Sequence, residues 1–267
     1  MKNIMRFSIL SIIFLLFGLL FSGCEKDDVA NPPVLKSYTT SKTEEHATQN
    51  TKVVVVSNNI GGIIVTGWSV DTSMRAYMFN TIEASSIELA NAHFNDIKFK
   101  YTIIGDTIFV SIETPSNTEE IIYKSSSLSL DIPYAMNCII SNVDGSIFLD
   151  QLSSTVTITN SAGEVNIERQ EGSCVVSSSN NINVQMIVPL GGVCSLNTTN
   201  GNVSLSIPDS THATVSLRTD QGTVTYTNLS FSQLSQTSTL LTGILGNGNS
   251  TITLYTKRGN ILLNGMQ

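Results

Sequence analysis

From residue 51 onward, the chain alternates apolar and polar residues in short stretches. Val203 to Ile207, with the sequence VSLSI, is one clear case, and Val156 to Ile158 is another. Alternation with a period of two predicts half-buried β-strands, because successive side chains of a strand point to opposite faces. Asn, Ser and Gly separate the stretches and predict turns between the strands.

One phrase recurs: an apolar pair two positions apart, a polar turn, a glycine, and a second apolar pair. The first apolar residues form a column of fixed phase, made of Cys138, Val156, Cys174, Cys194, Val215 and Ile252. The expected structural turn glycines are Gly61, Gly145, Gly163, Gly201, Gly222 and Gly259. In the phrase that begins at Cys174, Asn180 or Asn181 takes the place of the glycine. After glycine, asparagine is the residue that best tolerates a positive φ.

The spacing of the turns selects an architecture. Gly145 and Gly163 are 18 residues apart, and Gly201 and Gly222 are 21 apart. This period is too short for a helix–strand unit or a propeller blade, but it suits one coil of a solenoid. We therefore predict an all-β, single-stranded, right-handed parallel β-helix (β-solenoid) over residues 51–267. A sandwich of antiparallel hairpins is the alternative, because Asn-Gly turns favour hairpins. The fixed phase of the column favours the solenoid.

Residues 68–105 interrupt the repeat near the N-terminal side of this domain. Ile82 to Phe94 could form a short helix, and Ile97 to Ile112 returns to a strand pattern. We expect this irregular segment to cap the solenoid. Trp68 is expected to belong to the cap, because a single Trp does not make the aromatic platform of a sugar-binding groove.

Residues 1–23 have the features of a secretory signal. Lys2 and Arg6 precede an apolar run that ends in Phe21-Ser22-Gly23-Cys24. The run is shorter than the roughly 20 residues that a membrane-spanning helix needs. The Ser-Gly-Cys exit resembles the lipobox of bacterial lipoproteins, which implies lipidation at Cys24. An ordinary signal peptide cleaved near a cysteine is the alternative.

The residues after Cys24 are polar. Glu25 to Asp28 (EKDD) resembles the surface-export signal of some Gram-negative lipoproteins, which implies an outer-membrane lipoprotein exposed on the cell surface. A solvated charge run on a periplasmic protein is the alternative. Residues 24–50 lack periodicity and predict a flexible tether. The expected organisation is thus a signal peptide (1–23), a tether (24–50) and a solenoid (51–267).

Composition narrows the possible functions. The chain has 267 residues, of which only 13% are charged, and a formal net charge of −7. About 25% is usual for soluble domains. The acidic balance argues against nucleic-acid binding. Abundant Ser, Thr and Asn predict a neutral, polar surface.

Several stretches between Asn183 and Gly265 carry a family resemblance. They are IVPLGG at 187–192, TTNGNV at 198–203, SIP at 206–208, ATVSLRT at 213–219, GILGNG at 243–248 and LYTKRGNI at 254–261. In this order they resemble the bacterial "putative adhesin" β-solenoid family, an adhesin-like domain of unknown function, over about residues 51–267. The resemblance implies a parallel β-helix and an adhesin role, and it brings no catalytic motif.

The remaining cysteines and histidines give little sign of chemistry. Cys138, Cys174 and Cys194 share one column with Val and Ile, so we expect buried apolar filler. A Cys174–Cys194 disulfide is possible if their coils stack. The histidines are His46, His93 and His212, and their spacing does not support a zinc site.

Carboxylates matter for the enzyme hypothesis, because many β-helix proteins cleave polysaccharides with paired acids. The candidates are Asp144, Asp150, Glu164, Glu168, Glu171, Asp209 and Asp220. Asp144 and Asp220 precede turn glycines and are expected to bind local backbone donors. The glycines of 243–248 lack the Lys-Ser or Lys-Thr of a phosphate-binding loop, so a solenoid turn is the better account.

The sequence thus predicts a non-enzymatic, lipid-anchored surface protein without a cofactor. Its expected partners are the outer membrane, through the lipid anchor, and a host, matrix or glycan ligand bound by a solenoid face. No nucleic-acid partner is expected. A polysaccharide-binding or polysaccharide-cleaving β-helix is the alternative, and an envelope scaffold with periplasmic partners is a third possibility.

Overall fold

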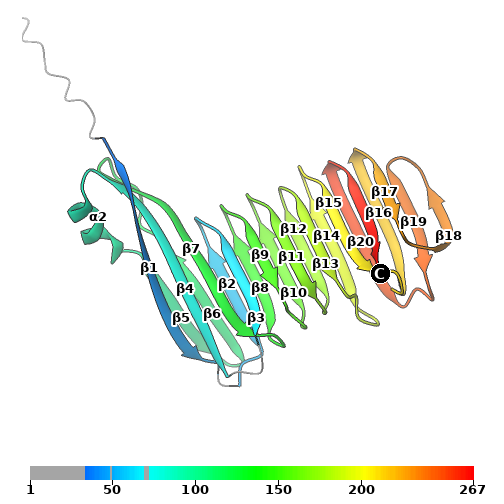
Figure 1. The fold of residues 1–267 in the computed structure, drawn as a ribbon, viewed down its shortest axis with the longest axis horizontal. Coiled ribbons are helices and arrows are strands. Elements are labelled where there is room, and N and C mark those ends of the chain that lie inside the picture. The colour runs from blue at the N-terminus through cyan, green and yellow to red at the C-terminus, as the bar shows by residue number, and fades with distance from the viewer. Residues whose placement is uncertain (1–33, 49, 69–71) are drawn as a thin grey trace, which may run out of the picture. The chain divides into compact units, whose positions relative to one another are not determined.

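The computed structural model describes residues 34–48, 50–68 and 72–267, which form two facing β-sheets and one short helix (Figure 1). Sheet A contains, in spatial order, β1 (Lys36–Ala47), β4 (Ser73–Ala84), β7 (Ile121–Pro133), β3 (Ile63–Trp68), β9 (Ile147–Asp150), β11 (Val165–Gln170), β13 (Ile182–Met186), β15 (Val203–Pro208), β21 (Ile261–Met266) and β17 (Val224–Thr227).

Sheet B faces sheet A across the apolar core. It contains, in spatial order, β18 (Phe231–Gln236), β19 (Leu240–Leu245), β16 (Ala213–Gln221), β20 (Ser250–Arg258), β14 (Val193–Thr198), β12 (Cys174–Ser178), β10 (Val156–Asn160), β8 (Asn137–Asn142), β2 (Val53–Asn58), β6 (Thr107–Glu113) and β5 (Lys98–Ile104).

Each regular coil gives one strand to sheet B and the next strand to sheet A. The coils stack in parallel and in register, as Cys138, Val156 and Cys174 show by pairing in one row. All members of the predicted column are buried. Burying such a side chain contributes about 1.5–3 kcal/mol, so the stack is held by its repeated apolar columns. The β-solenoid prediction is confirmed, and parallel neighbours exclude the hairpin sandwich. The predicted right hand stays a prediction.

The order of the coils differs from the order in the sequence. In sheet B, β20 lies between β14 and β16, and in sheet A, β21 lies between β15 and β17. The interval from Gly201 to Gly222 is one circuit of the chain, as predicted, but the coils that contain these two glycines are not neighbours in the stack. At the other end, the β2–β3 coil lies between β6–β7 and β8–β9. The repeated pattern does not reveal this order, because every phrase presents a similar apolar column to its neighbours.

The N-terminal cap combines long antiparallel strands with the helix. Strand β4 pairs with β1 and β7, and β5 forms a hairpin with β6. Helix α2 (Ile87–Phe94) begins after Ser86, whose hydroxyl accepts the N–H of Leu89 at 3.2 Å. Ala90 of α2 packs with Ile82 and Tyr123 in a second small core. The expected helix therefore starts five residues late, because residues 82–84 complete β4.

The tether prediction is wrong for residues 36–47, which form β1. This strand pairs with β4 along its whole length, from Lys36 opposite Ala84 to Ala47 opposite Ser73. The strand was not predicted because its sequence is polar. An edge strand keeps one side in solvent and is commonly protected by charges such as Lys42 and Glu44. Residues 24–33 of the expected tether and the signal segment 1–23 lie outside the described residues.

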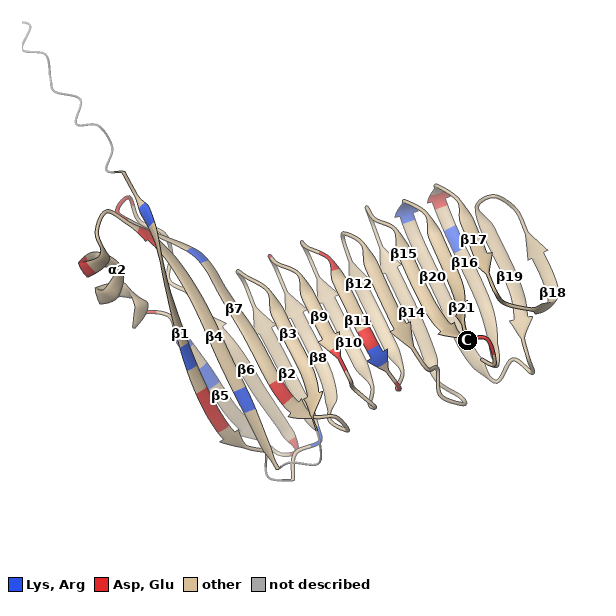
Figure 2. Ribbon diagram, viewed as in Figure 1, with Lys and Arg blue, Asp and Glu red and all other residues tan. Residues whose placement is uncertain are grey.

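Charge is unevenly distributed along the stack. Figure 2 shows Lys, Arg, Asp and Glu gathered on the N-terminal strands β1, β4 and β5, with few on the C-terminal coils. Residues 221–256 contain no charged residue. The neutral, polar surface expected from composition is thus a property of the C-terminal coils more than of the cap.

Candidate functional site: a groove along one corner of the solenoid

Each coil has two corners, and they differ in structure. At the first, which we call the glycine corner, the chain passes from sheet B to sheet A through the short turns around Gly145, Gly163 and their equivalents. At the second, which we call the groove corner, it passes from sheet A back to sheet B through residues 134–136, 151–155, 171–173, 187–192 and 209–212.

The glycine corner contains all the predicted turn glycines, stacked coil upon coil. A Cβ on Gly145, at φ 133, would lie 2.3 Å from the carbonyl oxygen of Gly61, and one on Gly163 would lie 2.4 Å from that of Gly145. Gly222 stacks on Gly259, and Gly259 on Gly201. Gly201 has no positive φ, but its Cβ would lie 2.4 Å from Asn180, so Asn180-Asn181 takes the glycine's place in this ladder.

The asparagines near these turns do something other than adopt a positive φ. Asn58, Asn142 and Asn160 end their strands and are buried, at 1–2% exposure. The side-chain amide of Asn142 donates to the carbonyls of Gly145 at 2.9 Å and Gly61 at 3.3 Å, and Asn160 repeats the pattern one coil on. The column continues through Ser178, Thr198, Thr256 and Thr219.

The hydroxyls of this column replace the amides in the C-terminal coils. Thr256 donates to the carbonyl of Gly201 and Thr219 to that of Gly259, each at 2.8 Å. Buried carbonyls need such donors, because an unpaired one costs free energy. The glycine corner is therefore closed and structural.

The groove corner holds a groove of about 740 Å³. It crosses the carboxyl ends of seven neighbouring strands of sheet A, in the order β7, β3, β9, β11, β13, β15 and β21. Its lining residues are Gly67, Trp68, Tyr134, Gln151, Leu152, Ser153, Arg169, Gln170, Glu171, Gln185, Met186, Ile187, Pro208, Asp209, Ser210, Met266 and Gln267. Among these residues, only Trp68, Glu171 and Asp209 had been considered individually as candidates from the sequence.

Two residues in left-handed backbone conformations shape the middle of the groove. Gln151 has φ 63 and Arg169 has φ 49, and they follow Asp150 and Glu168, which pair with each other across β9 and β11. Strand β11 also bulges against β13 between Ile167 and Gln170. Non-glycine residues in this conformation cost free energy and cluster at functional sites. The left-handed conformations of Gln151 and Arg169 could not be predicted from the sequence, because neither Gln nor Arg favours a positive φ.

The electrostatics of the groove are dominated by carboxylates. Arg169 donates to both oxygens of Asp150, through Nε at 2.7 Å and through a second, shorter contact. This hydrogen bond raises the pKa of Arg169. Glu171 and Asp209 are exposed, and no ion pair of either is found within the described part of the chain. Their strands β11 and β15 are separated by β13 and so lie about 10 Å apart.

Aromatic residues form one end of the groove. Tyr134 is 41% exposed. Trp68, expected in the cap, lies in β3 and lines the groove, with the guanidinium of Arg75 above its ring at 4.2 Å. The indole N–H of Trp68 is buried and has no hydrogen-bond partner among residues 34–48, 50–68 and 72–267.

The other candidate carboxylates lie elsewhere. Glu164 accepts a hydrogen bond from Asn181 at 2.8 Å. Asp220 accepts from the hydroxyl of Tyr255 at 2.6 Å and from Arg218 at 3.0 Å, rather than from local backbone donors as expected. The bond from Tyr255, aided by Arg218, lowers the pKa of Asp220. Asp144 lies in its turn, where its backbone carbonyl accepts the N–H of Gly61.

The three described cysteines are buried and free. Cys174 lies directly opposite Cys194 in the register of β12 and β14, so the coils stack as the disulfide alternative required, but no bond joins them. Burial raises the pKa of Cys138 and Cys174 to about 12. Burial also raises the pKa of Cys194 well above its ordinary value, with the neighbouring Cys174 adding to the shift. Such thiols are neutral at ordinary pH and poor nucleophiles.

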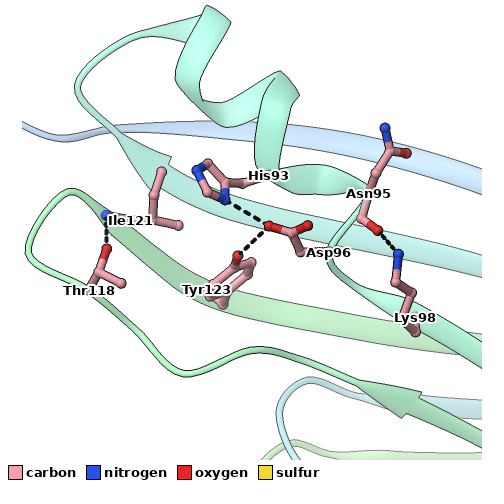
Figure 3. Close-up of polar contacts among 7 residues, drawn as sticks. All are labelled: His93, Asn95, Asp96, Lys98, Thr118, Ile121 and Tyr123. Atoms are coloured by element: carbon pink, nitrogen blue, oxygen red, sulfur yellow. Dashed lines mark hydrogen bonds and ion pairs between the residues drawn. The ribbon is translucent and has the colours of Figure 1, made fainter.

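The histidines have separate local contacts. Figure 3 shows the ring of His93 directed at the carboxylate of Asp96, at 2.8 Å, with the hydroxyl of Tyr123 directed at the same oxygen at 3.5 Å. These contacts join the end of α2 to β7. Burial, followed by the charge of Asp96, raises the pKa of Tyr123. His46 stacks on Tyr101 with ring centroids 4.0 Å apart. The third, His212, accepts the backbone N–H of Asn247 at 3.1 Å.

Among the residues that the structure describes, no group of three or more His, Cys, Asp or Glu side chains could hold a metal ion. Within the same residues, no helix is long and apolar enough to cross a membrane. Cys24, the expected lipidation site, lies outside the described residues.

Comparison with protein families gives the identification. The profile of the Toastrack DUF4097 family matches residues 48–264. The chain belongs to this family. The match confirms the family resemblance inferred from the sequence, and it begins immediately after β1. The Toastrack fold is thus a solenoid whose two sheets carry the parallel coils described above.

Two solved structures resemble this Toastrack chain. One is a "putative cell adhesion protein" from Clostridium sporogenes, with 11% identity, a TM-score of 0.50, and coverage of 86% of this chain and 100% of the other. The second is a "putative adhesin" from Bacteroides fragilis, with 12% identity, a TM-score of 0.31, and coverage of 85% and 97%. The first likeness supports the fold alone. A comparison with curated proteins gives no match.

Proposed function

We propose that this Toastrack protein is a lipid-anchored, non-enzymatic surface protein that binds an extracellular ligand in the groove. The observation that carries the proposal is the groove itself, which crosses seven strands on an otherwise regular solenoid. Ligand sites are typically concave and combine apolar walls with a few polar groups. Leu152, Met186 and Pro208 supply such walls, and Gln185 and Asp209 supply such groups.

An adhesin-like role agrees with the name of the Clostridium sporogenes structure, although that likeness supports only the fold. Adhesion through a groove differs from the flat-face contact expected from the sequence. The outer face of sheet B carries small hydroxyl side chains in the C-terminal coils, as in the row of Ser195, Thr253 and Ser216, which Val175 continues on the N-terminal side. Such residues give no strong anchor for binding, whereas the groove offers buried surface and aromatic rings.

A binding role is favoured over catalysis by the environment of the groove carboxylates. A glycosidase needs one carboxyl group whose pKa is raised so that it can donate a proton. Burial in an apolar pocket produces such a shift. Glu171 and Asp209 are both exposed, and Asp150 is held by Arg169. These acids are better suited to accepting hydrogen bonds from a ligand.

The anchor rests on the sequence around Cys24. The apolar run that ends in Ser-Gly-Cys supports lipidation of Cys24, and the following EKDD supports export to the outer face of the outer membrane. Two acyl chains suffice for stable anchoring, because each buried methylene contributes about 0.8 kcal/mol.

The anchor can be tested by fractionating cells that express the wild type, Cys24→Ala and Cys138→Val. We expect the wild type and Cys138→Val in the outer membrane and accessible to protease on intact cells, and Cys24→Ala outside the membrane fraction. Cys138 is the matched control, because it is a buried thiol in the apolar column. Equal membrane retention of Cys24→Ala would refute lipid anchoring. Retention with protease protection would refute surface display.

A further inference from the structure

We propose that the groove binds an extended, uncharged glycan chain. This inference rests on the proposed ligand-binding function and names the chemical class of the ligand. Shape gives the first argument. Seven strands about 4.8 Å apart make the groove roughly 29 Å long. The groove, of about 740 Å³, is therefore long and narrow, which suits a single polymer chain lying along the solenoid axis.

The backbone of the groove argues against an extended peptide. Peptides that add a strand to a protein use free backbone donors and acceptors at a sheet edge. Here the backbone N–H groups already bind neighbouring coils: Glu171 donates to Leu152 at 2.8 Å, and Ile187 to Gln170 at 2.7 Å. Asp209 likewise donates to Met266 at 3.0 Å. Recognition must therefore come from side chains.

The exposed polar side chains that line the groove are of the kinds that bind hydroxyl groups. Gln151, Gln185 and Ser210 provide donors and acceptors, and Glu171 and Asp209 provide acceptors, all of them exposed. A polyol satisfies such a mixture, because each hydroxyl both donates and accepts.

The groove also offers apolar surfaces on which sugar rings can pack. The ring of Tyr134 is 41% exposed at one end of the groove, and Ile187 is 52% exposed further along. Aromatic rings present a flat apolar surface with a polar tip. The carbon-bound hydrogens of a sugar ring can pack on such a face while its hydroxyls reach the amides and carboxylates.

Charge argues against an anionic ligand. The positive charge of Arg169 is neutralised by Asp150, and that of Arg75 by Glu45 at 3.5 Å. Glu171 and Asp209 leave the groove with an excess of negative charge. Like charges in a cleft repel an anionic ligand, so uronic-acid polymers and nucleic acids are disfavoured.

The test measures binding of the purified full-length protein to defined probes by calorimetry. The probes are hexasaccharides of glucose, of mannose, of N-acetylglucosamine and of galacturonic acid, together with an uncharged decapeptide of Ser, Thr and Gly. We expect at least one neutral hexasaccharide to bind, and the galacturonic acid chain and the peptide not to bind.

Variants then locate the site. Tyr134→Ala should weaken binding about tenfold, in line with the loss of one aromatic contact. Phe109→Ala is the matched control, because Phe109 is also 41% exposed but lies on β6 of sheet B. It should change affinity less than twofold. The charge reversal Glu171→Lys with Asp209→Lys should allow the galacturonic acid chain to bind. Equal melting temperatures would show that the variants fold.

Several results would overturn the inference: no neutral hexasaccharide binds, the peptide or the acidic chain binds better, or Phe109→Ala weakens binding as much as Tyr134→Ala. A parallel adherence assay separates this failure from failure of the proposed function. If cells displaying the protein adhere and Tyr134→Ala abolishes adherence, but neutral hexasaccharides neither bind nor compete, the ligand class is wrong and the binding function stands. If displaying cells adhere no better than cells lacking the protein, the adhesion role fails, while hexasaccharide binding would still support the groove.

Discussion

The two corners of the coil perform the same geometric task by different means. At the glycine corner, Gly145, Gly163 and their equivalents stack so closely that no side chain fits, and buried amides or hydroxyls satisfy the turn carbonyls. At the groove corner, the turns vary in length, and Gln151 and Arg169 adopt left-handed conformations without glycine. The first corner is uniform and closed, whereas the second is irregular and open.

The difference teaches where a repeat protein can place a binding site. Every coil must solve the same packing problem at the glycine corner, so its residues recur in the sequence. The groove corner is less uniform, because its connections vary in length and keep their backbones paired, and close glycine stacking occurs there only in places, as for Gly172 against Ser154. Side chains there are free to differ from coil to coil. Loops that vary on a rigid scaffold commonly carry function.

The largest expected effect comes from closing the space at the glycine corner. Gly145→Ala would place a Cβ 2.3 Å from a backbone oxygen at φ 133, so we expect a loss of about 3–5 kcal/mol in unfolding free energy. Denaturant unfolding measures it. Gly105→Ala is the control, because Gly105 has φ 63 but no atom within 4 Å of its Cβ. It should cost only about 1–2 kcal/mol. Equal costs would show that conformation, not close stacking, makes the glycines necessary.

The next effect concerns the buried polar column. Asn142→Ala removes two hydrogen bonds to buried carbonyls and should cost about 1–3 kcal/mol. Asn142→Thr supplies the hydroxyl that Thr256 uses at the equivalent position, and it also removes the unpaired amide oxygen of Asn142. It should retain most of the stability. If both variants unfold at the same denaturant concentration, the column does not act through its donors.

The three buried cysteines can be used to test whether the core between the two corners excludes water. At pH 8, Cys138, Cys174 and Cys194 should resist thiol reagents in the folded Cys24→Ala protein and react fully in denaturant, because burial raises their pKa. The folded state holds these protons more tightly than the unfolded state. Stability should therefore be intact below the ordinary thiol pKa near 9 and fall as the pH rises towards 12.

Cysteine variants sharpen the same test. Cys138→Val should cost less than about 1.5 kcal/mol, because it preserves apolar volume, whereas Cys138→Ser buries a hydroxyl and should cost about 1–3 kcal/mol. Rapid native-state labelling, or equal stability of the two variants, would contradict a dry core.

The smallest effect is expected at the groove corner. Gln151→Gly relieves a left-handed conformation but adds freedom to the unfolded chain, so stability should rise by at most about 1 kcal/mol. Thr157→Gly, in the middle of β10, serves as the control and should lose about 1 kcal/mol. Calorimetric melting distinguishes the two. Marked destabilisation by Gln151→Gly would mean that the Gln151 side chain, rather than its backbone, holds the groove corner.

The sequence predicted the regular part of the fold well and the irregular parts less well. The apolar column and the stacked turn glycines could be predicted because each coil repeats them. The reversal of coil order at β20–β21 was not, since equivalent phrases can stack in any order. Strand β1 was missed because pairing with β4, rather than apolar alternation, defines it. The role of Asn58, Asn142 and Asn160 as buried hydrogen-bond donors was not predicted, because burial is not visible in a turn-like sequence.

The amino-acid sequence by itself determined that this chain is a β-solenoid, since alternation and a repeated glycine are local requirements of every coil. It also indicated the family and the candidate anchor at Cys24. Only the tertiary structure brought Trp68, Tyr134, Arg169, Glu171 and Asp209 to one groove. These residues lie in four different segments of the chain, at the ends of β3, β7, β11 and β15, with no spacing in common. Their proximity arises because stacking places the ends of neighbouring strands about 4.8 Å apart, whatever their separation along the chain.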